Sequence, residues 1–365
     1  MKISAWHYPR NKQANYILDG MENDLLERVT IFAPRKRGKT EFILSDVAPN
    51  AINRGILPVY VDFWANTRSP VRVFCDSVLN AIERYKGSFK SIFKASNISS
   101  VKFANMIELK RSTGSLGENE LSMANLAFDQ LNRLEVPILL LLDEVQHLAT
   151  SADFTPFTAA LRSFMVNRPI KNVKGIFTGS SRDGLVKLFN NTKAPFYSSS
   201  SEIKFPKLDQ DFVDYELSVF KDLSGKSLNS SEAYGVFETQ FYEPGRFIEL
   251  LKNMILDKVY EIHEGVERFD NSITTEKLRS YEALYQSIAH FDQTLLIQLA
   301  DNKLKTLYSD DTYQTLSVIN KGLTVKRHKV SNAIVRLCSK GILYSGGRGE
   351  YRFEDQGFQS YISSL

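Results

Sequence analysis

The residues best suited to chemistry lie between Ala33 and Thr40, where the chain reads A-P-R-K-R-G-K-T. This stretch matches the phosphate-binding pattern G-x-x-x-x-G-K-[ST] at every position except the first. In such a loop, backbone N–H groups and a helix N-terminus face the phosphates of ATP. We expect Lys39 to reach the β- and γ-phosphate oxygens and Thr40 to offer its hydroxyl to Mg²⁺. The alternative is a basic turn that lies on the surface or contacts nucleic acid.

Alanine replaces the first glycine of the pattern at Ala33. Alanine fits there if the backbone has a negative φ, and Pro34 favours an extended conformation for the residue before it. The predicted nucleotide-binding set is therefore the complete loop and the residue after it: Ala33, Pro34, Arg35, Lys36, Arg37, Gly38, Lys39, Thr40 and Glu41.

Two acids follow a run of large aliphatic residues, Ile138 to Leu142. Such a run is typical of a central parallel strand that is buried on both faces. Asp143 and Glu144 then emerge at the carboxyl end of the strand, where open α/β sheets bind ligands. We expect Asp143 to hold Mg²⁺ through water and Glu144 to orient or deprotonate the attacking water. The alternative is a strand end with solvated acids.

Two further positions could contact the γ-phosphate. Thr178 or Ser180, at the end of a predicted strand, could contact the γ-phosphate or the attacking water. The alternative is a plain turn, in which glycine and serine are also typical. Arg246 lies in the first turn of a helix that begins at Pro244. Arginine is unfavourable at the positive end of the helix dipole, so an anion is expected nearby, either ATP or Glu243.

Strand and helix patterns alternate in the first part of the chain and predict a parallel sheet with helices on both faces. The expected helix after the loop, 41–53, has Pro49 as a kink or early end and Gly55 as its stop. Residues 86–118 are rich in Ser, Lys and Gly and are expected to be an exposed insertion. The predicted strands are 29–32, 57–64, 138–144, 173–178 and 203–205; the other predicted helices are 8–27, 69–85, 118–134 and 157–166.

The second part of the chain is predicted to be helical over 209–260, with a linker or loop pair at 261–278. Helical patterns at 281–290, 292–301, 312–319 and 326–340 precede a hairpin that turns at 345–349. This order is typical of a winged helix-turn-helix, with 326–340, capped by Thr324, as the recognition helix. Its DNA phosphate contacts would come from Lys326, Arg327, Lys329 and Arg348. The alternative is that this face packs on protein.

The composition limits the class of protein. The chain has 365 residues, a net charge of +4 and two cysteines, Cys75 and Cys338, in apolar helical patterns. Its length predicts two or three domains, and the charge permits an acidic partner without requiring one. No apolar run is long enough to span a membrane and no secretory signal is visible, so we expect a cytoplasmic protein without membrane contact.

With these motifs in place, the chain resembles the AAA+ and STAND P-loop ATPases of the archaeal-type, origin-recognition-like branch. The resemblance is carried by A-P-R-K-R-G-K-T (33–40), I-L-L-L-L-D-E-V-Q-H-L (138–148), F-T-G-S-S (177–181), E-P-G-R-F (243–247) and the closing S-K-G-I-L and Y-R-F-E-D. It implies an ATPase core at 1–207 with a five-stranded parallel sheet, an α-helical lid at 208–277 and a winged-helix domain at 278–365.

The resemblance also implies roles for single residues. Walker A is 33–40, Walker B is Asp143 and Glu144, sensor 1 lies in 178–181, and sensor 2 is Arg246. Tyr8, Pro9 and Arg10 would lie near the adenine. Relatives often carry an arginine after sensor 1 that acts across a subunit boundary, where this chain reads A-P-F-Y-S-S-S. The candidates for that role are Arg162, Arg168 and Arg182.

These features predict an ATP-binding and hydrolysing switch that couples its nucleotide state to the orientation of a winged-helix domain. Glu144, Lys39, Thr178, Ser180 and Arg246 form the expected catalytic set, with ATP and Mg²⁺ as cofactors. One hypothesis is a DNA-linked ATPase of replication, transposition or a mobile element. The alternatives are a STAND-type signalling or defence ATPase whose winged helix binds protein only, and a nucleotide-binding scaffold that does not hydrolyse. A homo-oligomer or a protein partner is compatible with each.

Overall fold

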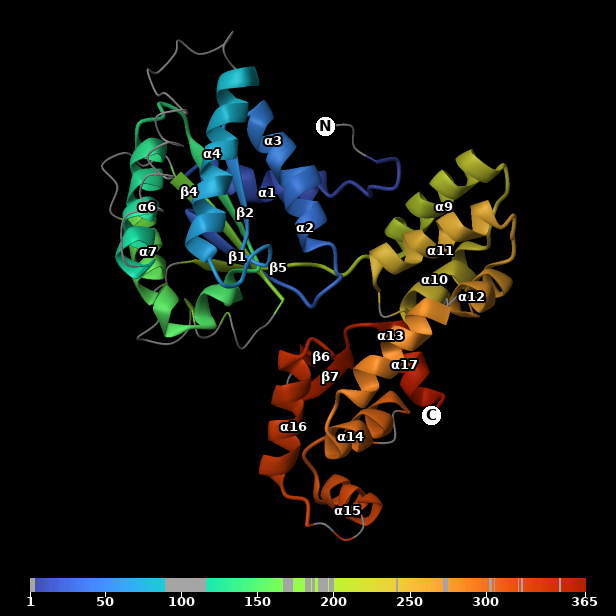
Figure 1. The fold of residues 1–365 in the computed structure, drawn as a ribbon. Coiled ribbons are helices and arrows are strands. Elements are labelled where there is room, and N and C mark those ends of the chain that lie inside the picture. Colours follow the sequence, from blue (N-terminus) through green and yellow to red (C-terminus); the bar gives the residue numbers. More distant parts are fainter. Residues whose placement is uncertain are drawn as a thin grey trace. The chain divides into compact units, whose positions relative to one another are not determined.

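The computed structural model divides the chain into two compact units, Met1–Leu208 and Asp209–Leu365 (Figure 1). The residues described are 4–88, 116–166, 173–180, 185, 188, 189, 196, 200–240, 242–271, 275–301, 304, 306–320, 322, 324–347 and 349–365. Most of the predicted insertion at 86–118 lies outside these ranges. The finer division into domains at 1–207, 208–277 and 278–365 stays a prediction.

A five-stranded parallel sheet forms the centre of the first unit, as predicted from the sequence. Its strands are β1 (Arg28–Phe32), β2 (Leu57–Asp62), β3 (Ile138–Asp143), β4 (Val173–Gly179) and β5 (Ser201–Lys204), in the spatial order β2-β3-β4-β1-β5. Strand β4 therefore lies between β1 and β3. This order brings the carboxyl ends of three strands, each followed by a predicted site residue, to one edge of the sheet.

Helices cover both faces of this sheet (Figure 1). Leu139 and Leu141 of β3 pack into the core on one face, and Ile138, Leu140 and Leu142 pack into the core on the other. This division explains why β3 reads as an unbroken aliphatic run. One face carries α1 (Asn11–Glu22) and the helical run after β1; the other carries α4 (Pro70–Ser88), α6 (Leu116–Asn132) and α7 (Thr155–Val166).

The helical run after β1 has three parts: α2 (Lys39–Glu41), a π-helical segment (Phe42–Val47) and α3 (Ala48–Asn53). The expected early end at Pro49 is wrong, because this residue lies in the first turn of α3, where a proline is tolerated. The predicted stop at Gly55 is confirmed, since the helix ends before it and Gly55 has a φ of +73°.

The second unit begins with α9 (Gln210–Ser224), α10 (Ser230–Thr239) and α11 (Pro244–Leu256). The rings of Phe212 and Phe247 lie 5.0 and 5.4 Å from that of Phe237 and join the three helices. The linker expected at 261–278 is wrong, because α12 (Ile262–Asn271) occupies most of it. Gly265 permits this helix to approach α11, since a Cβ there would lie 2.6 Å from the Met254 side chain.

The remaining elements are α13 (Thr275–Gln286), α14 (His290–Ala300), α15 (Asp310–Ile319), α16 (Arg327–Ser339), the antiparallel strands β6 (Leu343–Gly347) and β7 (Glu350–Phe353), and α17 (Gln356–Ser363). Helices followed by a hairpin were expected, whereas α17 was not. The expected cap at Thr324 is wrong: Lys326 is the N-cap of α16 and makes no capping hydrogen bond through its side chain. Arg336 of α16 makes a bidentate pair with buried Asp292 of α14, at 2.9 and 2.7 Å.

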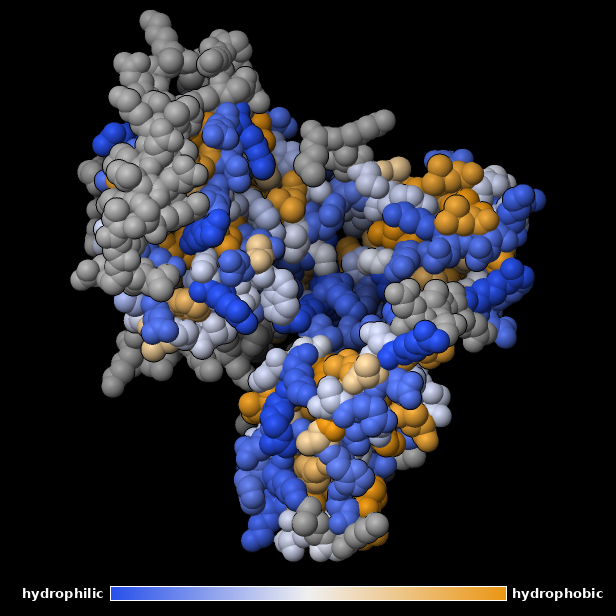
Figure 2. Space-filling view, in the orientation of Figure 1, coloured by the Kyte–Doolittle hydropathy of each residue, from blue (hydrophilic) through white to orange (hydrophobic). Residues whose placement is uncertain are grey.

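On the face in view, hydrophilic residues dominate the surface of each unit and apolar residues form separate patches (Figure 2). Among the described residues, no helix is long and apolar enough to cross a membrane.

Candidate nucleotide site

The loop between β1 and α2 turns through two residues with positive φ, Lys36 at +59° and Gly38 at +79°. Ala33 is buried and is not among the described residues with positive φ, so the missing glycine costs no backbone strain at this position. The Lys39 ammonium donates to the carbonyl oxygens of Ala33 and Pro34, at 2.7 and 3.0 Å. The loop is therefore folded around the lysine that is predicted to bind phosphate.

Burial lowers the pKa of Lys39, and the carboxylates of Glu144 and Asp143 oppose that shift. Arg35 and Arg37 also lower the pKa of Lys39, because their positive charges disfavour the protonated ammonium. A buried cation in contact with carbonyl oxygens alone is poorly compensated. The site therefore favours an anion at the loop.

Asp143 is the centre of a polar cluster at the carboxyl edge of the sheet. Its Oδ2 accepts hydrogen bonds from Thr40 Oγ1 at 2.6 Å and from Tyr60 OH at 3.2 Å. Its Oδ1 accepts from Thr178 Oγ1 and from the backbone N–H of Glu144. Burial, followed by the Asp143 carboxylate, raises the pKa of Tyr60 and keeps that phenol a donor. Four groups, from β2, β4, the residue after β3 and the loop helix, thus fix one carboxylate.

Oxygen donors from a hydroxyl and a carboxylate are what Mg²⁺ prefers. Thr40 and Asp143 present these atoms within hydrogen-bond distance of each other at the mouth of the phosphate loop. The donor set of the chain therefore fits Mg²⁺ bound beside the phosphates.

Glu144 follows Asp143 in a left-handed backbone conformation, with a φ of +54°. Its Oε2 accepts hydrogen bonds from Ser180 Oγ, at 2.7 Å, and from Gln146 Nε2. The structure thus joins Glu144 to Ser180, and Asp143 to Thr178, at the ends of neighbouring strands β3 and β4.

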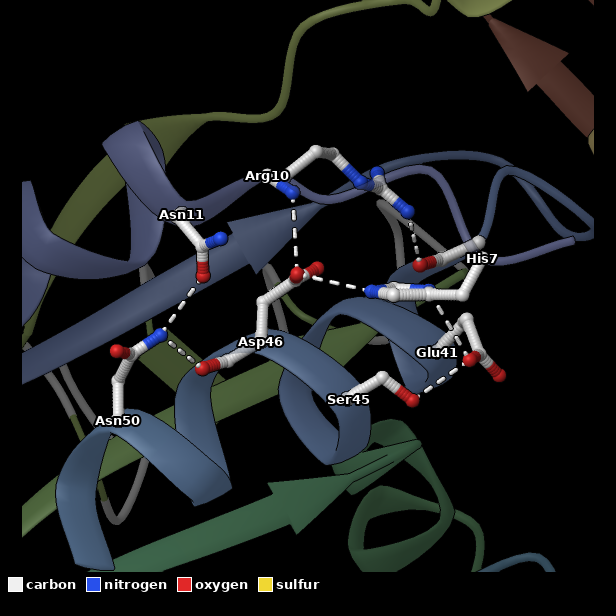
Figure 3. A network of polar contacts seen from close by, with 8 residues as sticks. His7, Arg10, Asn11, Glu41, Ser45, Asp46 and Asn50 are labelled. Carbon is white, nitrogen blue, oxygen red and sulfur yellow. Dashed lines mark hydrogen bonds and ion pairs between the residues drawn. The ribbon is translucent and has the colours of Figure 1, made fainter. Parts of the chain in front are cut away.

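A buried network ties the N-terminal segment to the loop helix (Figure 3). Asp46, in the π-helical segment, accepts hydrogen bonds from His7 Nε2 at 2.9 Å and from the Arg10 backbone N–H at 3.0 Å. His7 Nδ1 lies 3.2 Å from Glu41 Oε1. The Arg10 guanidinium donates to the Gly38 carbonyl at 2.8 Å. Arg10 therefore contacts the phosphate loop directly, whereas Pro9 is exposed beside it.

The Arg10 guanidinium also lies over two rings, 5.4 Å from that of Phe42 and 4.8 Å from that of Phe205. Burial lowers the pKa of Arg10 to about 10, although Asp46 and Glu41 oppose that shift. The group remains a cation at neutral pH.

A second aromatic contact borders the loop. The guanidinium of Arg35 lies 4.4 Å from the ring of Trp64, and the ring of His147 lies 4.7 Å from that of Trp64 in an edge-to-face arrangement. Trp64 is 48% exposed and lies in the turn that follows β2. The phosphate loop therefore contacts a tryptophan through Arg35, so the fluorescence of Trp64 is expected to respond to the conformation of the loop.

The remaining predicted residues lie in the second unit, elsewhere on the first unit or outside the described residues. Arg246 belongs to the second unit, where it pairs with Asp270 at 2.7 Å, so neither Glu243 nor a nucleotide is needed to explain its presence there. Arg162 is exposed on α7. Arg168, Arg182 and Arg348 lie outside the described residues.

Sequence reasoning missed His7, Asp46, Tyr60 and Gln146. The signal for Tyr60 was present: it alternates with buried Val59 and Val61 on β2, a strand that ends level with Asp143. The roles of His7, Asp46 and Gln146 depend on contacts between segments far apart in the sequence, to which Gln146 adds a local contact with Glu144.

Comparisons with solved structures find the same fold over nearly the whole chain. A Walker-type ATPase of Pyrococcus abyssi is 14% identical, with a TM-score of 0.63 over 98% of this chain and 99% of that one. The chain has the fold of an origin-recognition-type AAA+ P-loop ATPase. No protein-family model and no curated protein sequence matches it.

Two further structures with this ATPase fold come from Aeropyrum pernix. The ORC2 protein, in its ADPNP and ADP complexes, is 13% identical, with a TM-score of 0.56 over 97% of this chain and 92% of that one. The ORC1 protein, solved in complex with DNA, is 14% identical, with a TM-score of 0.52 over 98% and 93%.

Proposed function

We propose that the chain binds ATP and hydrolyses it slowly, as a switch that couples its nucleotide state to the orientation of its C-terminal winged-helix domain. The observation that carries this proposal is the arrangement of Lys39, Thr40, Asp143 and Glu144, which meet at the carboxyl ends of β1 and β3. Structures of the same fold were solved in an ADP form and as ADPNP and ADP complexes, which supports an adenine nucleotide as the ligand.

Each residue of the cluster has a separate task in this proposal. Lys39 leaves the Ala33 and Pro34 carbonyls to bind the β- and γ-phosphate oxygens, and the loop N–H groups bind the rest. Thr40 and Asp143 hold Mg²⁺, which neutralises charge on the phosphates when bound. Glu144 accepts the proton of the water whose oxygen bonds to the γ-phosphorus, while the bond to the β–γ bridging oxygen breaks and ADP leaves.

Hydrolysis removes the γ-phosphate from its protein partners, and this change is the proposed source of movement. Thr178 and Ser180 would sense the γ-phosphate from the first unit, and Arg246 from the second, after exchanging Asp270 for the nucleotide. Arg10 and the loop would hold the rest of ATP.

The first prediction concerns Glu144→Gln, which keeps the size of the side chain but cannot accept the proton. We expect ATP turnover to fall at least ~100-fold, with ATP affinity changed less than ~3-fold. Phosphate release and calorimetric titration with ATP and ADP measure the two quantities. Glu83→Gln, at an exposed position of α4, is the matched control. Undiminished turnover would remove Glu144 from the mechanism, and tight ATP binding without turnover in wild type would leave the scaffold alternative.

We propose DNA as the partner of the second unit. Lys326 and Arg327 are exposed at the start of α16, and a structure of similar fold was solved in complex with DNA. Arg327 and Lys329 also lie over the rings of Tyr308 and Phe291, at 5.7 and 4.8 Å, which holds their cationic groups at the surface of the domain. A winged helix that binds protein only is the alternative.

A further inference from the structure

Gln146 carries a buried amide beside Glu144 and Ser180. None of the sequence motifs assigns a role to this residue. It lies in the 3₁₀ turn Val145–Ala149 that follows Glu144, and 7% of its surface is exposed. Its Nε2 donates both to Glu144 Oε2 and, at 3.2 Å, to Ser180 Oγ. The Ser180 hydroxyl in turn donates to Glu144 Oε2 at 2.7 Å.

These three hydrogen bonds form a closed triangle with only one consistent arrangement of protons. The two N–H groups of Gln146 serve Glu144 and Ser180, and the single Ser180 proton serves Glu144. The triangle holds the Glu144 carboxylate by Oε2 alone. Glu144 Oε1 is therefore the oxygen left to accept the proton of a water molecule.

The surroundings fix the orientation of the Gln146 amide. A flipped amide would bring its carbonyl oxygen against the Glu144 carboxylate, and two acceptors repel each other. In the observed orientation Oε1 is buried and has no hydrogen-bond partner among the described residues. A Cβ at Gly179 would lie 2.8 Å from that oxygen, so the glycine after Thr178 makes room for the amide.

We infer that Gln146 is the positioning residue that couples Glu144 to the end of β4, holding the carboxylate by Oε2 so that Oε1 faces the water. The inference rests on the proposed ATPase function. It gives the chain a direct link between the acid after β3 and Ser180 after β4, so that a γ-phosphate contact made by Ser180 alters the position of Glu144.

The test uses Gln146→Leu in the full chain, a change that keeps the volume and removes both donors. We expect turnover to fall ~10- to 100-fold, because a displaced catalytic group costs about that much. The dissociation constant of a slowly hydrolysed ATP analogue, followed by tryptophan fluorescence, should change less than ~2-fold. Gln146→Glu, which cannot donate when ionised, should be at least as impaired.

A double variant separates positioning from a structural role. In the Glu144→Gln background, Gln146→Leu should cause no further loss of turnover, since the group through which it acts is gone. Gln130→Leu is the matched control, because Gln130 on α6 also has a buried Oε1 without a hydrogen-bond partner among the described residues.

The outcomes distinguish the two proposals. If Glu144→Gln is as active as wild type, the proposed function fails before Gln146 is reached. If Glu144→Gln is impaired while Gln146→Leu is fully active, or if the two losses multiply, Gln146 does not act through Glu144 and the inference is overturned. A crystal structure of Gln146→Leu with the Glu144 carboxylate still on Ser180 in the same rotamer would also overturn it.

Discussion

Arg10 supports the phosphate loop from a segment 28 residues earlier in the sequence. It joins the Gly38 carbonyl, the rings of Phe42 and Phe205 and, through its backbone, Asp46. Its Nε and Nη1 are buried without hydrogen-bond partners among the described residues. A planar guanidinium can lie between two rings while it donates sideways, and a lysine cannot reproduce this geometry.

Arg10→Lys should therefore lower the free energy of unfolding of the first unit by about 1–3 kcal/mol. Both tryptophans, Trp6 and Trp64, belong to this unit, so urea unfolding followed by tryptophan fluorescence reports on it alone. Arg72→Lys, on the exposed side of α4, is the matched control. Equal stabilities of the two variants would show that the ring contacts of Arg10 contribute nothing.

Sequence predicts the residues of this site whose roles depend on local spacing. Lys39 and Thr40 are fixed by the loop pattern, and Asp143 and Glu144 by the end of an aliphatic strand. The sequence does not predict the roles of Tyr60, His7 and Gln146. Their hydrogen-bond partners depend on strand register and on the packing of the N-terminal segment. The backbone at the first loop position accommodates a Cβ, since Ala33 is not among the described residues with positive φ.

Helix α9 carries a carboxyl group that is poorly suited to its position. Glu216 is fully buried, and neither carboxyl oxygen has a hydrogen-bond partner among the described residues. Burial raises the pKa of Glu216 to about 8, and Lys252 opposes this shift. At neutral pH the helix therefore holds a protonated carboxyl group.

The sign of the resulting pH dependence follows from linkage. Between the unfolded pKa of about 4.5 and the folded value of about 8, the folded chain binds a proton that the unfolded chain has lost. The free energy of unfolding of the second unit should fall with rising pH in this window, by up to ~1.4 kcal/mol per pH unit, and level off above it.

Glu216→Met should remove this slope and stabilise the second unit most at pH 8, because it replaces the acid with an apolar side chain of similar length. Thermal unfolding followed by tyrosine near-UV circular dichroism measures it, since 11 of the 16 tyrosines lie in the second unit. Glu232→Met, at an exposed position of α10, is the control. An unchanged slope in Glu216→Met would assign the pH dependence to other groups.

Among the elements, the long helices and the buried strands were predictable, whereas α12 was not. Its apolar residues, Ile262, Val266 and Phe269, have helical spacing but lie within a run of charged residues. In a sequence, a glycine such as Gly265 favours the prediction of a loop. Its close contact with Met254, which explains the glycine within a helix, is visible only in the structure.

For the whole molecule, a net charge of +4 does not indicate whether the chain binds nucleic acid. The question to test is therefore whether α16 binds DNA. If Lys326 and Arg327 neutralise phosphates, the affinity for duplex DNA must fall as salt rises. The double variant Lys326→Ala, Arg327→Ala should reduce the slope of log affinity against log salt by ~0.9 for each phosphate that is no longer neutralised.

Measuring DNA binding at several salt concentrations, with and without ATP, tests this prediction and the coupling between the two units. Lys221→Ala, at an exposed position of α9, is the control. Absence of DNA binding at low salt would favour the protein-binding alternative. An equal DNA affinity with and without ATP would show that DNA binding is not coupled to the nucleotide state.

The π-helical segment Phe42–Val47 gives the helical run after the phosphate loop one residue more than an α-helix of the same length would hold. A turn whose hydrogen bonds span five residues holds one residue more than an α-helical turn. Deleting one residue between Phe42 and Ser45 would leave every motif intact and would let the segment close as an α-helical turn, with Asp46 kept on nearly the same face of the helix, toward His7 and Arg10. In a search for related chains, a segment one residue shorter after G-K-T is therefore compatible with the same site.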